Sequence, residues 1–296
     1  MIKDFFNSNG IEYEYSVSLK KYNTYKVDSK AMYVCFPSNM IELKELIKFL
    51  KKEKYKYLIL GNGSNVVFAF DYYDGVIIKL DKFNELRIDG NVVTVGAGYS
   101  LIKLSMEAIN NSLAGLEFAA GIPGSVGASA AMNAGAYNSS MSDIVREVKV
   151  MDDTGNTLTL TNKELEYGYR TSYLKDHKEY IVLEVVLDLS FGDKEELLSI
   201  VSDRRSRRMD TQPLDKPSAG SVFRNPEGMY AGALIENCGL KGYRINDAMV
   251  SDKHANFIVN VGNASGKDIE ELIYYIKDKV LEKYNVELKY EQIIIK

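Results

Sequence analysis

Glycine is concentrated in one quarter of this chain. Of the 22 glycines in 296 residues, eleven lie between Gly61 and Gly135. Backbone without Cβ atoms reaches left-handed conformations and approaches its neighbours closely, but it is costly to order inside a helix or a strand. A region of this kind therefore favours loops that lie against a ligand or another backbone. The rest of the chain must supply the scaffold that holds these loops.

That scaffold has the composition of an ordinary globular protein. Hydrophobic residues make up 46% and charged residues 26% of the chain, and the length allows two or three domains at roughly 100–200 residues each. Lys+Arg number 37 against 41 Asp+Glu, for a net charge of −4. No global charge therefore draws the chain to nucleic acid or to an anionic membrane surface. We expect neither as a partner.

Several common sites and signals are missing from the sequence. The N-terminal residues form no apolar signal segment, and no apolar run approaches the ~20 residues of a membrane span. Cys35 and Cys238 lie far apart, and the only histidines are His177 and His254, which argues against a disulfide framework or a metal site. Neither a GxSxG elbow nor a GxxxxGK[ST] loop occurs. We therefore expect a cytoplasmic protein that is not a hydrolase of the common types.

Hydrophobic periodicity predicts an α+β fold, with helices at 40–52, 100–109, 194–208 and 266–284. Short apolar runs predict strands over 57–60, 76–80, 86–95, 145–150, 157–160, 180–189, 256–261 and 290–295. The run 86–95 is expected to form a hairpin that turns at 89–91. The stretch 116–137 is rich in small residues, nearly uncharged and irregular. A change of composition near residue 195 marks the start of a second region.

The first glycine loop, Gly61-Asn62-Gly63-Ser64-Asn65, directly follows the expected strand 57–60. Glycine lets successive N–H groups converge on phosphate oxygens. The sixth position is Val66, so this is not the GxGxxG dinucleotide fingerprint. Taken alone, the motif fits an ordinary turn after a strand as well as a phosphate loop.

The second glycine loop is Gly121-Ile122-Pro123-Gly124-Ser125-Val126-Gly127. Its residues suit neither an amphipathic helix nor a regular strand, and the segment carries almost no charge. Uncharged backbone of this kind is typical of a loop that lies against a partly buried ligand, although it also fits a loop of small packing residues. Two such loops in one region favour a large phosphate-bearing ligand such as a dinucleotide.

Longer motifs, in order along nearly the whole chain, resemble those of the UDP-N-acetylenolpyruvoylglucosamine reductase family, which acts in peptidoglycan precursor synthesis. They are NTY (23–25), LGNGSN (60–65), LEFAAGIPGSVG (116–127), MNAGAY (132–137), YGYRTS (167–172), QPLDKPSAGSVFRNP (212–226), HANFIVN (254–260) and ELKYE (287–291). The short path from Tyr167 to residue 195 is similar to the subtype that lacks an extra tyrosine-bearing loop.

The resemblance implies an FAD-binding fold of the vanillyl-alcohol-oxidase/PCMH type in two lobes, followed by a C-terminal α/β substrate-binding domain. The expected division is a first lobe over 1–79, a second lobe over 80–195 and the substrate domain over 196–296. The final strand, 290–296, is a candidate to return to the first lobe. We expect a monomer or a weak oligomer.

The reaction that the resemblance implies has two halves. NADPH, a co-substrate, reduces non-covalently bound FAD; a hydride then passes from the flavin N5 to C3 of the enolpyruvyl group, and C2 is protonated. Addition of hydride to an enol ether needs the substrate carboxylate to absorb negative charge, and it needs a proton donor at C2.

The resemblance assigns this chemistry to Arg170, Ser221 and Glu291. A guanidinium holds a carboxylate in a bidentate fork, which suits Arg170. Glu291 matches the catalytic glutamate of the family and could polarise the same carboxylate, and Ser221 matches its proton donor. Without the resemblance, the three would be a surface ion-pair partner, an edge-strand charge and a turn serine.

The same matching places the remaining residues. Tyr137 and Asn225 are expected to contact the substrate, and the Arg204–Arg208 cluster either reaches the UDP diphosphate or is a solvated helix end. FAD is expected to contact Gly61, Asn62, Gly63, Ser64, Asn65, Gly121, Ile122, Pro123, Gly124, Ser125, Gly127, Asn133, Ala134 and Gly135.

Departures from the family pattern occur at Asn62 and Ala128, where glycine is common, and at Asn246-Asp247, which replaces a small or glycine pair. They concern local loop geometry more than activity. Two alternatives to the reductase stay open: another FAD-dependent oxidoreductase of the same fold, or an inactive module that binds flavin or a UDP-sugar. Oxidases of this fold often attach flavin through His or Cys, and both residue types lie outside the two glycine loops.

Overall fold

Helices form where apolar residues recur at helical spacing behind a capping side chain. A computed structural model describes the whole chain, Met1–Lys296. In α2 (Met40–Lys52) the Asn39 side chain accepts hydrogen bonds from two first-turn N–H groups. In α3 (Leu101–Asn110) Ser100 has the same role. α8 (Gly266–Tyr284) begins with a capping box in which Ser265 and Asp268 bond to each other's backbone N–H. The three helices occupy the predicted positions.

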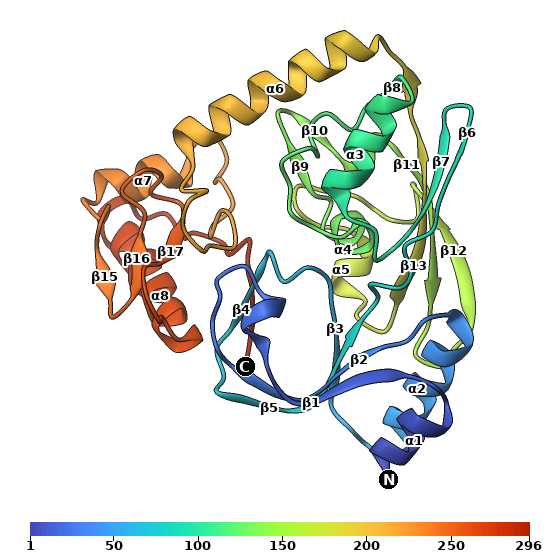
Figure 1. The fold of residues 1–296 in the computed structure, drawn as a ribbon. Coiled ribbons are helices and arrows are strands. Elements are labelled where there is room, and N and C mark those ends of the chain that lie inside the picture. The colour runs from blue at the N-terminus through green and yellow to red at the C-terminus, as the bar shows by residue number, and fades with distance from the viewer. The chain divides into compact units, whose positions relative to one another are not determined.

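A five-stranded antiparallel sheet, in the order β12-β11-β13-β7-β6, forms the wall behind the second glycine loop (Figure 1). Its alternating valines and leucines bury one face. The predicted hairpin is present, turning at Gly90. The strands are β6 (Leu86–Asp89), β7 (Val92–Gly96), β11 (Val145–Met151), β12 (Thr157–Thr161) and β13 (Ile181–Asp188).

A second sheet, in the order β1-β2-β5-β3, leads into the first glycine loop. Strands β3 and β5 run parallel, with Leu60 paired to Lys79, so Gly61 starts where the pairing ends. The strands are β1 (Glu12–Ser18), β2 (Lys30–Phe36), β3 (Tyr57–Leu60) and β5 (Tyr72–Lys79). Three elements were not predicted from periodicity: β1, β2 and the first helix, α1 (Ile2–Ser8).

The expectation of no regular structure over 116–137 is wrong in part. The segment contains a short helix, α4 (Val126–Ala131), which packs on β13 and β7, and it ends in β9 (Gly135–Ala136). The sequence VGASAA is small enough for the helix to pack close to the sheet without an amphipathic pattern. The short elements in this part of the chain are β8 (Leu113–Ala114), β10 (Ser139–Ser140), the 3₁₀ turn Met141–Asp143, α5 (Tyr173–Asp176) and β14 (Ser190–Phe191). The helix predicted at 194–208 is present as α6 (Lys194–Thr211), which extends further, to Thr211.

The C-terminal part packs α8 and α7 (Ala231–Asn237) around small sheets. One sheet is antiparallel in the order β15-β16-β17, and the other pairs β18 with β4 in parallel. α7 was not predicted, and β17 and β18 are shorter than the predicted strands. The strands are β4 (Val66–Phe68), β15 (Arg244–Ile245), β16 (Ala248–Val250), β17 (Ile258–Asn260) and β18 (Ile293–Ile295), and a 3₁₀ turn covers Leu19–Tyr22.

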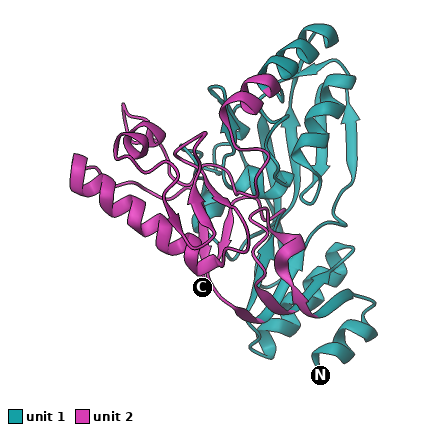
Figure 2. Cartoon of the chain, turned by 60° about the vertical axis from the view of Figure 1, so that its left-hand side comes forward, with its two compact units in different colours: residues 1–15, 33–61, 75–204 teal, residues 16–32, 62–74, 205–296 magenta.

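The chain forms two compact units (Figure 2). Unit 1 comprises residues 1–15, 33–61 and 75–204, and unit 2 comprises residues 16–32, 62–74 and 205–296. The division into lobes at 79 and 195 remains a prediction. None of the helices combines the length and the apolar character that crossing a membrane requires.

Candidate active site

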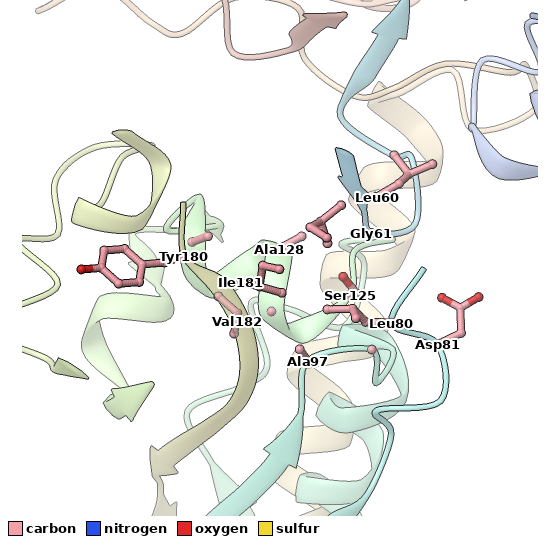
Figure 3. A pocket seen from close by; sticks show the side chains of 14 residues that line it. Leu60, Gly61, Leu80, Asp81, Ala97, Ser125, Ala128, Tyr180, Ile181 and Val182 are labelled. Atoms are coloured by element: carbon pink, nitrogen blue, oxygen red, sulfur yellow. The ribbon is translucent and has the colours of Figure 1, made fainter. Parts of the chain in front are cut away.

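A cavity of about 170 Å³ lies in unit 1, where β3, β5 and β7 end. Figure 3 shows its walls: the start of β13 and the helix α4 on one side, and the loops after β3 and β5 on the other. We call the lining residues the glycine cradle; they are Ile59, Leu60, Gly61, Leu80, Asp81, Ala97, Gly98, Ser125, Gly127, Ala128, Ala131, Tyr180, Ile181 and Val182.

Glycine backbone forms three parts of this wall. A Cβ atom on Gly61 would lie 2.8 Å from Oγ of Ser125. On Gly127 it would lie 2.7 Å from Cβ of Ala97, and on Gly98 it would lie 1.9 Å from a main-chain carbonyl oxygen. All three distances are shorter than real Cβ contacts, so the loops reach this arrangement only because these residues are glycine.

The second glycine loop is laid along the segment that joins β7 to α3. The N–H of Leu101 donates to Gly124 O at 3.0 Å, and the N–H of Val126 donates to Tyr99 O at 2.9 Å. The N–H of Gly127 donates to the carbonyl of Ala97 at 2.9 Å. These bonds satisfy the irregular backbone beside the cavity, as buried main-chain groups require.

Of the residues expected to contact FAD, Gly61, Ser125 and Gly127 line the cradle. The other residues of the second loop lie outside its lining, and Asn62 to Asn65 belong to unit 2. Their contacts with FAD remain predictions.

A buried lysine stands behind the first loop. Lys79 is 4% exposed, and its Nζ donates to Gly61 O at 2.5 Å and lies 3.2 Å from an Asp81 carboxylate oxygen. The lysine therefore links the carbonyl of the first loop to the carboxylate just beyond the end of β5, and it fixes these two parts of the wall to each other.

Arg170 adopts a left-handed backbone conformation, with φ of 56°. Its guanidinium donates to the carbonyl of Gly135 at 2.5 Å and to that of Asn133 at 3.5 Å. In return, the Asn133 side chain donates to Gly168 O at 2.8 Å and accepts from Ser142 N at 2.9 Å. The structure thus joins three predicted site residues, Asn133, Gly135 and Arg170, in one network that orients the guanidinium.

Tyr137 lies close to the end of that network and also has positive φ, 55°. Its hydroxyl donates to Arg204 O at 3.2 Å, and the Arg204 guanidinium lies 4.7 Å from the centre of its ring. The ring is 39% exposed. Of the arginine cluster, Arg204 is thus packed on a predicted substrate contact. Contact of the cluster with the UDP diphosphate remains a prediction.

In unit 2, the strand-like segments that carry Ser221 and Glu291 are adjacent. The N–H of Glu291 donates to Val222 O at 2.8 Å, and an antiparallel bridge pairs Phe223 with Tyr290. On the other side, Ser221 is bridged to Phe257. We call residues 219–223, 256–257 and 290–293 the Ser221 junction. It brings the predicted proton donor and the predicted glutamate to neighbouring positions.

Buried amide side chains hold this junction. Asn256 is 4% exposed; its Oδ1 accepts from Phe223 N at 3.0 Å, and its Nδ2 donates to Phe223 O at 2.8 Å. Asn65 of the first glycine loop donates through Nδ2 to Glu291 O at 3.1 Å. The amide of Ile293 donates back to Asn65 O at 2.9 Å, so the glutamate is tied to the end of that loop.

Asn225 lies just beyond the junction and is exposed. Its Oδ1 accepts from the backbone N–H of Ala231 at 3.0 Å, at the start of α7. The asparagine therefore anchors the turn between the Ser221 segment and this helix, and its role toward the substrate remains a prediction.

Comparison with known proteins gives the family. Residues 212–295 match the C-terminal domain of UDP-N-acetylenolpyruvoylglucosamine reductase, and residues 31–161 match an FAD binding domain. A UDP-N-acetylenolpyruvoylglucosamine reductase of Caldanaerobacter subterraneus subsp. tengcongensis is 43% identical over 91% of this chain and 89% of its own. That of Bacillus subtilis is 41% identical over 94% of this chain and 92% of its own. The chain belongs to the UDP-N-acetylenolpyruvoylglucosamine reductase family.

Solved structures agree with this assignment. The crystal structure of UDP-N-acetylenolpyruvylglucosamine reductase from Thermus caldophilus has a TM-score of 0.82 and 36% identity, and the match covers 97% of this chain and 99% of that one. A variant of Phl p 4, a glucose oxidase, has a TM-score of 0.50 and 14% identity over 62% of this chain and 42% of that one. The second likeness shows the fold alone. The predicted PCMH-type FAD-binding fold and the predicted family are confirmed.

The cradle fits the FAD of this family. Its walls are close-packed glycine backbone with a lysine behind them, and Asp81 is the one charged residue in the lining. No histidine or cysteine lines it, which fits a non-covalent cofactor. Gly61, Ser125 and Gly127 line the cavity, and their contacts with the dinucleotide remain predictions.

Sequence reasoning missed part of the cradle. Gly98, Lys79 and the first residues of β13 were not singled out. The GAG triplet at 96–98, directly after a strand, was a signal that could have indicated Gly98. A lysine inside an apolar strand, as at position 79, was another.

Three residues that depart from the family pattern, Ala128, Asn246 and Asp247, find local explanations, and nothing in the structure explains Asn62. Asn246 adopts φ of 49°, a left-handed conformation that asparagine tolerates better than most residues. The carboxylate of Asp247 accepts from Asn263 N at 2.7 Å. The Cβ of Ala128 would be 3.1 Å from a Cβ on Gly61, so alanine is accommodated while the facing residue is glycine.

No set of three or more His, Cys, Asp and Glu side chains is arranged to hold a metal ion. Cys35 and Cys238 are free, and burial raises the pKa of the Cys35 thiol. Burial lowers the pKa of His254, because the charged form of an imidazole is the protonated one. Its Nδ1 accepts from Asn256 N at 3.2 Å.

Proposed function

We propose that Arg170, Ser221 and Glu291 carry out the reduction of UDP-N-acetylglucosamine enolpyruvate to UDP-N-acetylmuramate, with NADPH as the reductant. The observation that carries this proposal is the hydrogen bond from the amide of Glu291 to the carbonyl of Val222, at 2.8 Å. It fixes a carboxylate-bearing residue beside the segment that presents the serine hydroxyl. When bound, FAD accepts a hydride from NADPH and supplies it to C3 of the enolpyruvyl group.

Arg170 is proposed to bind the carboxylate of the substrate. Negative charge develops on that carboxylate as C3 gains hydride, and a fixed guanidinium stabilises the enolate-like form more than the ground state. The bonds from the guanidinium to the Asn133 and Gly135 carbonyls orient it before the substrate arrives. Pre-oriented donors stabilise charge without reorganising.

Ser221 is proposed to give its hydroxyl proton to C2, which completes the lactyl ether. A serine hydroxyl is a weak acid, so the transfer requires stabilisation of the developing alkoxide by charged groups in a dry site. Glu291 is proposed to polarise the substrate carboxylate. The net reaction consumes one NADPH and one proton for each substrate reduced.

Tyr137 and Asn225 are proposed as further substrate contacts, and the glycine loops, with Asn133 to Gly135, as the FAD contacts. We also propose a cytoplasmic location and a monomer or weak oligomer. Support for a small-molecule partner comes from the net charge of −4 and from family membership.

The test is a purified holoenzyme assay. The protein should be yellow, and NADPH oxidation should require UDP-N-acetylglucosamine enolpyruvate, with UDP-N-acetylmuramate as the product. Oxidation of NADPH that proceeds equally without this substrate, or that needs molecular oxygen instead, would favour an oxidase of the same fold. A yellow protein that turns over neither would be an inactive binding module.

A further inference from the structure

A buried amide follows the proposed catalytic glutamate in the sequence. Gln292 is 4% exposed. Its Nε2 donates to the carbonyl oxygens of Ala219 and Gly220, at 3.1 Å each. Its Oε1 accepts from the hydroxyl of Tyr25 at 3.0 Å. Both N–H groups of the side chain therefore donate to main-chain carbonyls of the two residues that precede Ser221.

The turn before Ser221 needs such a donor. Gly220 adopts φ of 75°, a left-handed conformation, and nothing lies within 4 Å of where its Cβ would be. Packing therefore does not hold the turn there. Buried carbonyl groups outside a regular ladder require a partner, and the Gln292 side chain supplies it for two successive carbonyls.

Tyr25 holds the glutamine from the opposite end. The ring is 0% exposed, and the main-chain carbonyl of Tyr25 accepts from Asn260 Nδ2 at 2.9 Å. The carbonyl oxygens of Ala219 and Gly220 can only accept, so the NH₂ group of Gln292 faces the turn and its Oε1 faces the Tyr25 hydroxyl. The hydroxyl therefore donates, and it pairs the amide oxygen that the turn leaves over.

Two connections thus run from neighbouring residues to one short segment. Glu291 bonds through its backbone to Val222, and Gln292 bonds through its side chain to Ala219 and Gly220. Ser221 lies between the two points of attachment. A change at either point shifts the serine relative to the glutamate.

We propose that Gln292 is a positioning residue that sets the backbone of Ser221 for proton transfer to C2. The inference rests on the proposed role of Ser221. Gln292 itself touches no reacting atom in this scheme; it acts through the turn. Misplacing a reacting group by about 1 Å costs on the order of 10²-fold in rate.

The test compares three variants in stopped-flow measurements of the flavin absorbance. Gln292→Met keeps an unbranched side chain but loses both donors to the turn. Tyr25→Phe removes only the phenolic hydroxyl and leaves the two hydrogen bonds from Gln292 to the carbonyls of Ala219 and Gly220. The double variant, Tyr25→Phe with Gln292→Met, removes the unpaired hydroxyl that the single methionine variant leaves buried.

We expect Gln292→Met to slow flavin reoxidation by substrate about 10- to 100-fold, with flavin reduction by NADPH unchanged. The solvent deuterium isotope effect on reoxidation should rise, because protonation becomes more limiting. Tyr25→Phe should reoxidise close to the wild-type rate. The double variant should recover thermal stability relative to Gln292→Met without recovering the rate.

Other outcomes overturn the proposal. If the double variant regains both stability and the reoxidation rate, or if Gln292→Met reoxidises as fast as wild type, Gln292 is structural only. Should Gln292→Met fail to fold, the double variant decides by the same criterion. Failure of the proposed function looks different, because reduced wild-type flavin would then not be reoxidised by the enolpyruvyl substrate.

Discussion

The cavity in unit 1 and the Ser221 junction in unit 2 hold their parts in place by different means. In the glycine cradle, Gly61, Gly98 and Gly127 let neighbouring segments meet at distances that no Cβ would allow. In the junction, buried amides such as Asn256 and Gln292 satisfy the main chain of the neighbouring segment. The cradle therefore depends on the absence of Cβ atoms, and the junction depends on hydrogen bonds from side-chain amides.

This difference teaches which substitutions each region tolerates. Adding one methyl group disrupts backbone contacts in the cradle, while the polar character of its side chains matters less. In the junction, shape can be conserved and function still lost, because a buried carbonyl without its donor is costly. The cradle is therefore tested by adding a methyl group to a glycine, and the junction is tested by removing a polar side chain.

The largest effect is expected at the hydroxyl of the junction. Ser221→Ala should slow flavin reoxidation by the enolpyruvyl substrate by about 10²–10³, the usual loss when one transition-state donor is removed. Flavin reduction by NADPH should stay as in wild type, since the cradle is untouched. Stopped-flow absorbance of the flavin separates the two half-reactions. Unchanged reoxidation would remove Ser221 from the mechanism.

The next test removes an amide rather than a hydroxyl. Asn256→Ala leaves the N–H and the C=O of Phe223 unpaired in a buried setting, which should lower the free energy of unfolding by about 2–4 kcal/mol. Urea unfolding followed by circular dichroism measures the change. A loss below 0.5 kcal/mol, on the order of an ordinary surface substitution, would mean that the junction is not held by its side chains.

A smaller effect is expected from one methyl group in the cradle. Gly98→Ala places a Cβ 1.9 Å from a main-chain oxygen, and the required backbone shift should cost about 1–3 kcal/mol and weaken FAD binding. Gly90→Ala is the matched control, because its φ is 60° but its Cβ would have no neighbour within 4 Å. Flavin fluorescence titration of the apoprotein compares them. Equal FAD affinity in both variants would show that close backbone approach does not shape the cradle.

The smallest effect concerns pH at His254, which lies beside the junction and accepts from Asn256 N at 3.2 Å, whereas the lining of the cradle has no histidine. Burial lowers the pKa of His254 below its ordinary 6.5, so the unfolded chain takes up this proton at a higher pH than the folded one. As pH falls through about 6.5, the free energy of unfolding should therefore decrease.

His254→Asn keeps an acceptor near the N–H of Asn256 and removes the titration. We expect the wild type to lose more stability than this variant between pH 7.5 and about pH 5.5. Urea unfolding at both pH values gives the two differences. Parallel losses in the two proteins would show that His254 does not titrate differently in the folded state.

The same contrast explains how much of the fold could be predicted from the sequence. The helix 266–284 was predicted at its observed bounds, because Ser265 and Asp268 mark its start and its apolar residues recur regularly. α7 was missed, since AGALIEN is short and contains a glycine. The loops of the cradle are rich in glycine, so their presence could be predicted from the sequence.

The junction could not be predicted in the same way. Tyr25 and Gln292 are 267 positions apart, and neither belongs to a local pattern that would link them. Arg170, Ser221 and Glu291 were found only through the family motifs. Their spacing alone carried no signal, because side-chain pairing across distant segments depends on the fold that the whole chain reaches.

The parallel pairing of β4 with β18 has a consequence for the synthesis of the protein. Val66 pairs with Ile293 and Phe68 with Ile295, so a segment translated early waits for one translated very late. Until the last residues have left the ribosome, β4 lacks its partner strand, and Asn65 lacks the main-chain groups of Glu291 and Ile293 to which it bonds. Every residue that lines the glycine cradle is translated earlier. A chain that stalls near its end would therefore lack the glutamate proposed for catalysis while it keeps the whole lining of the cradle.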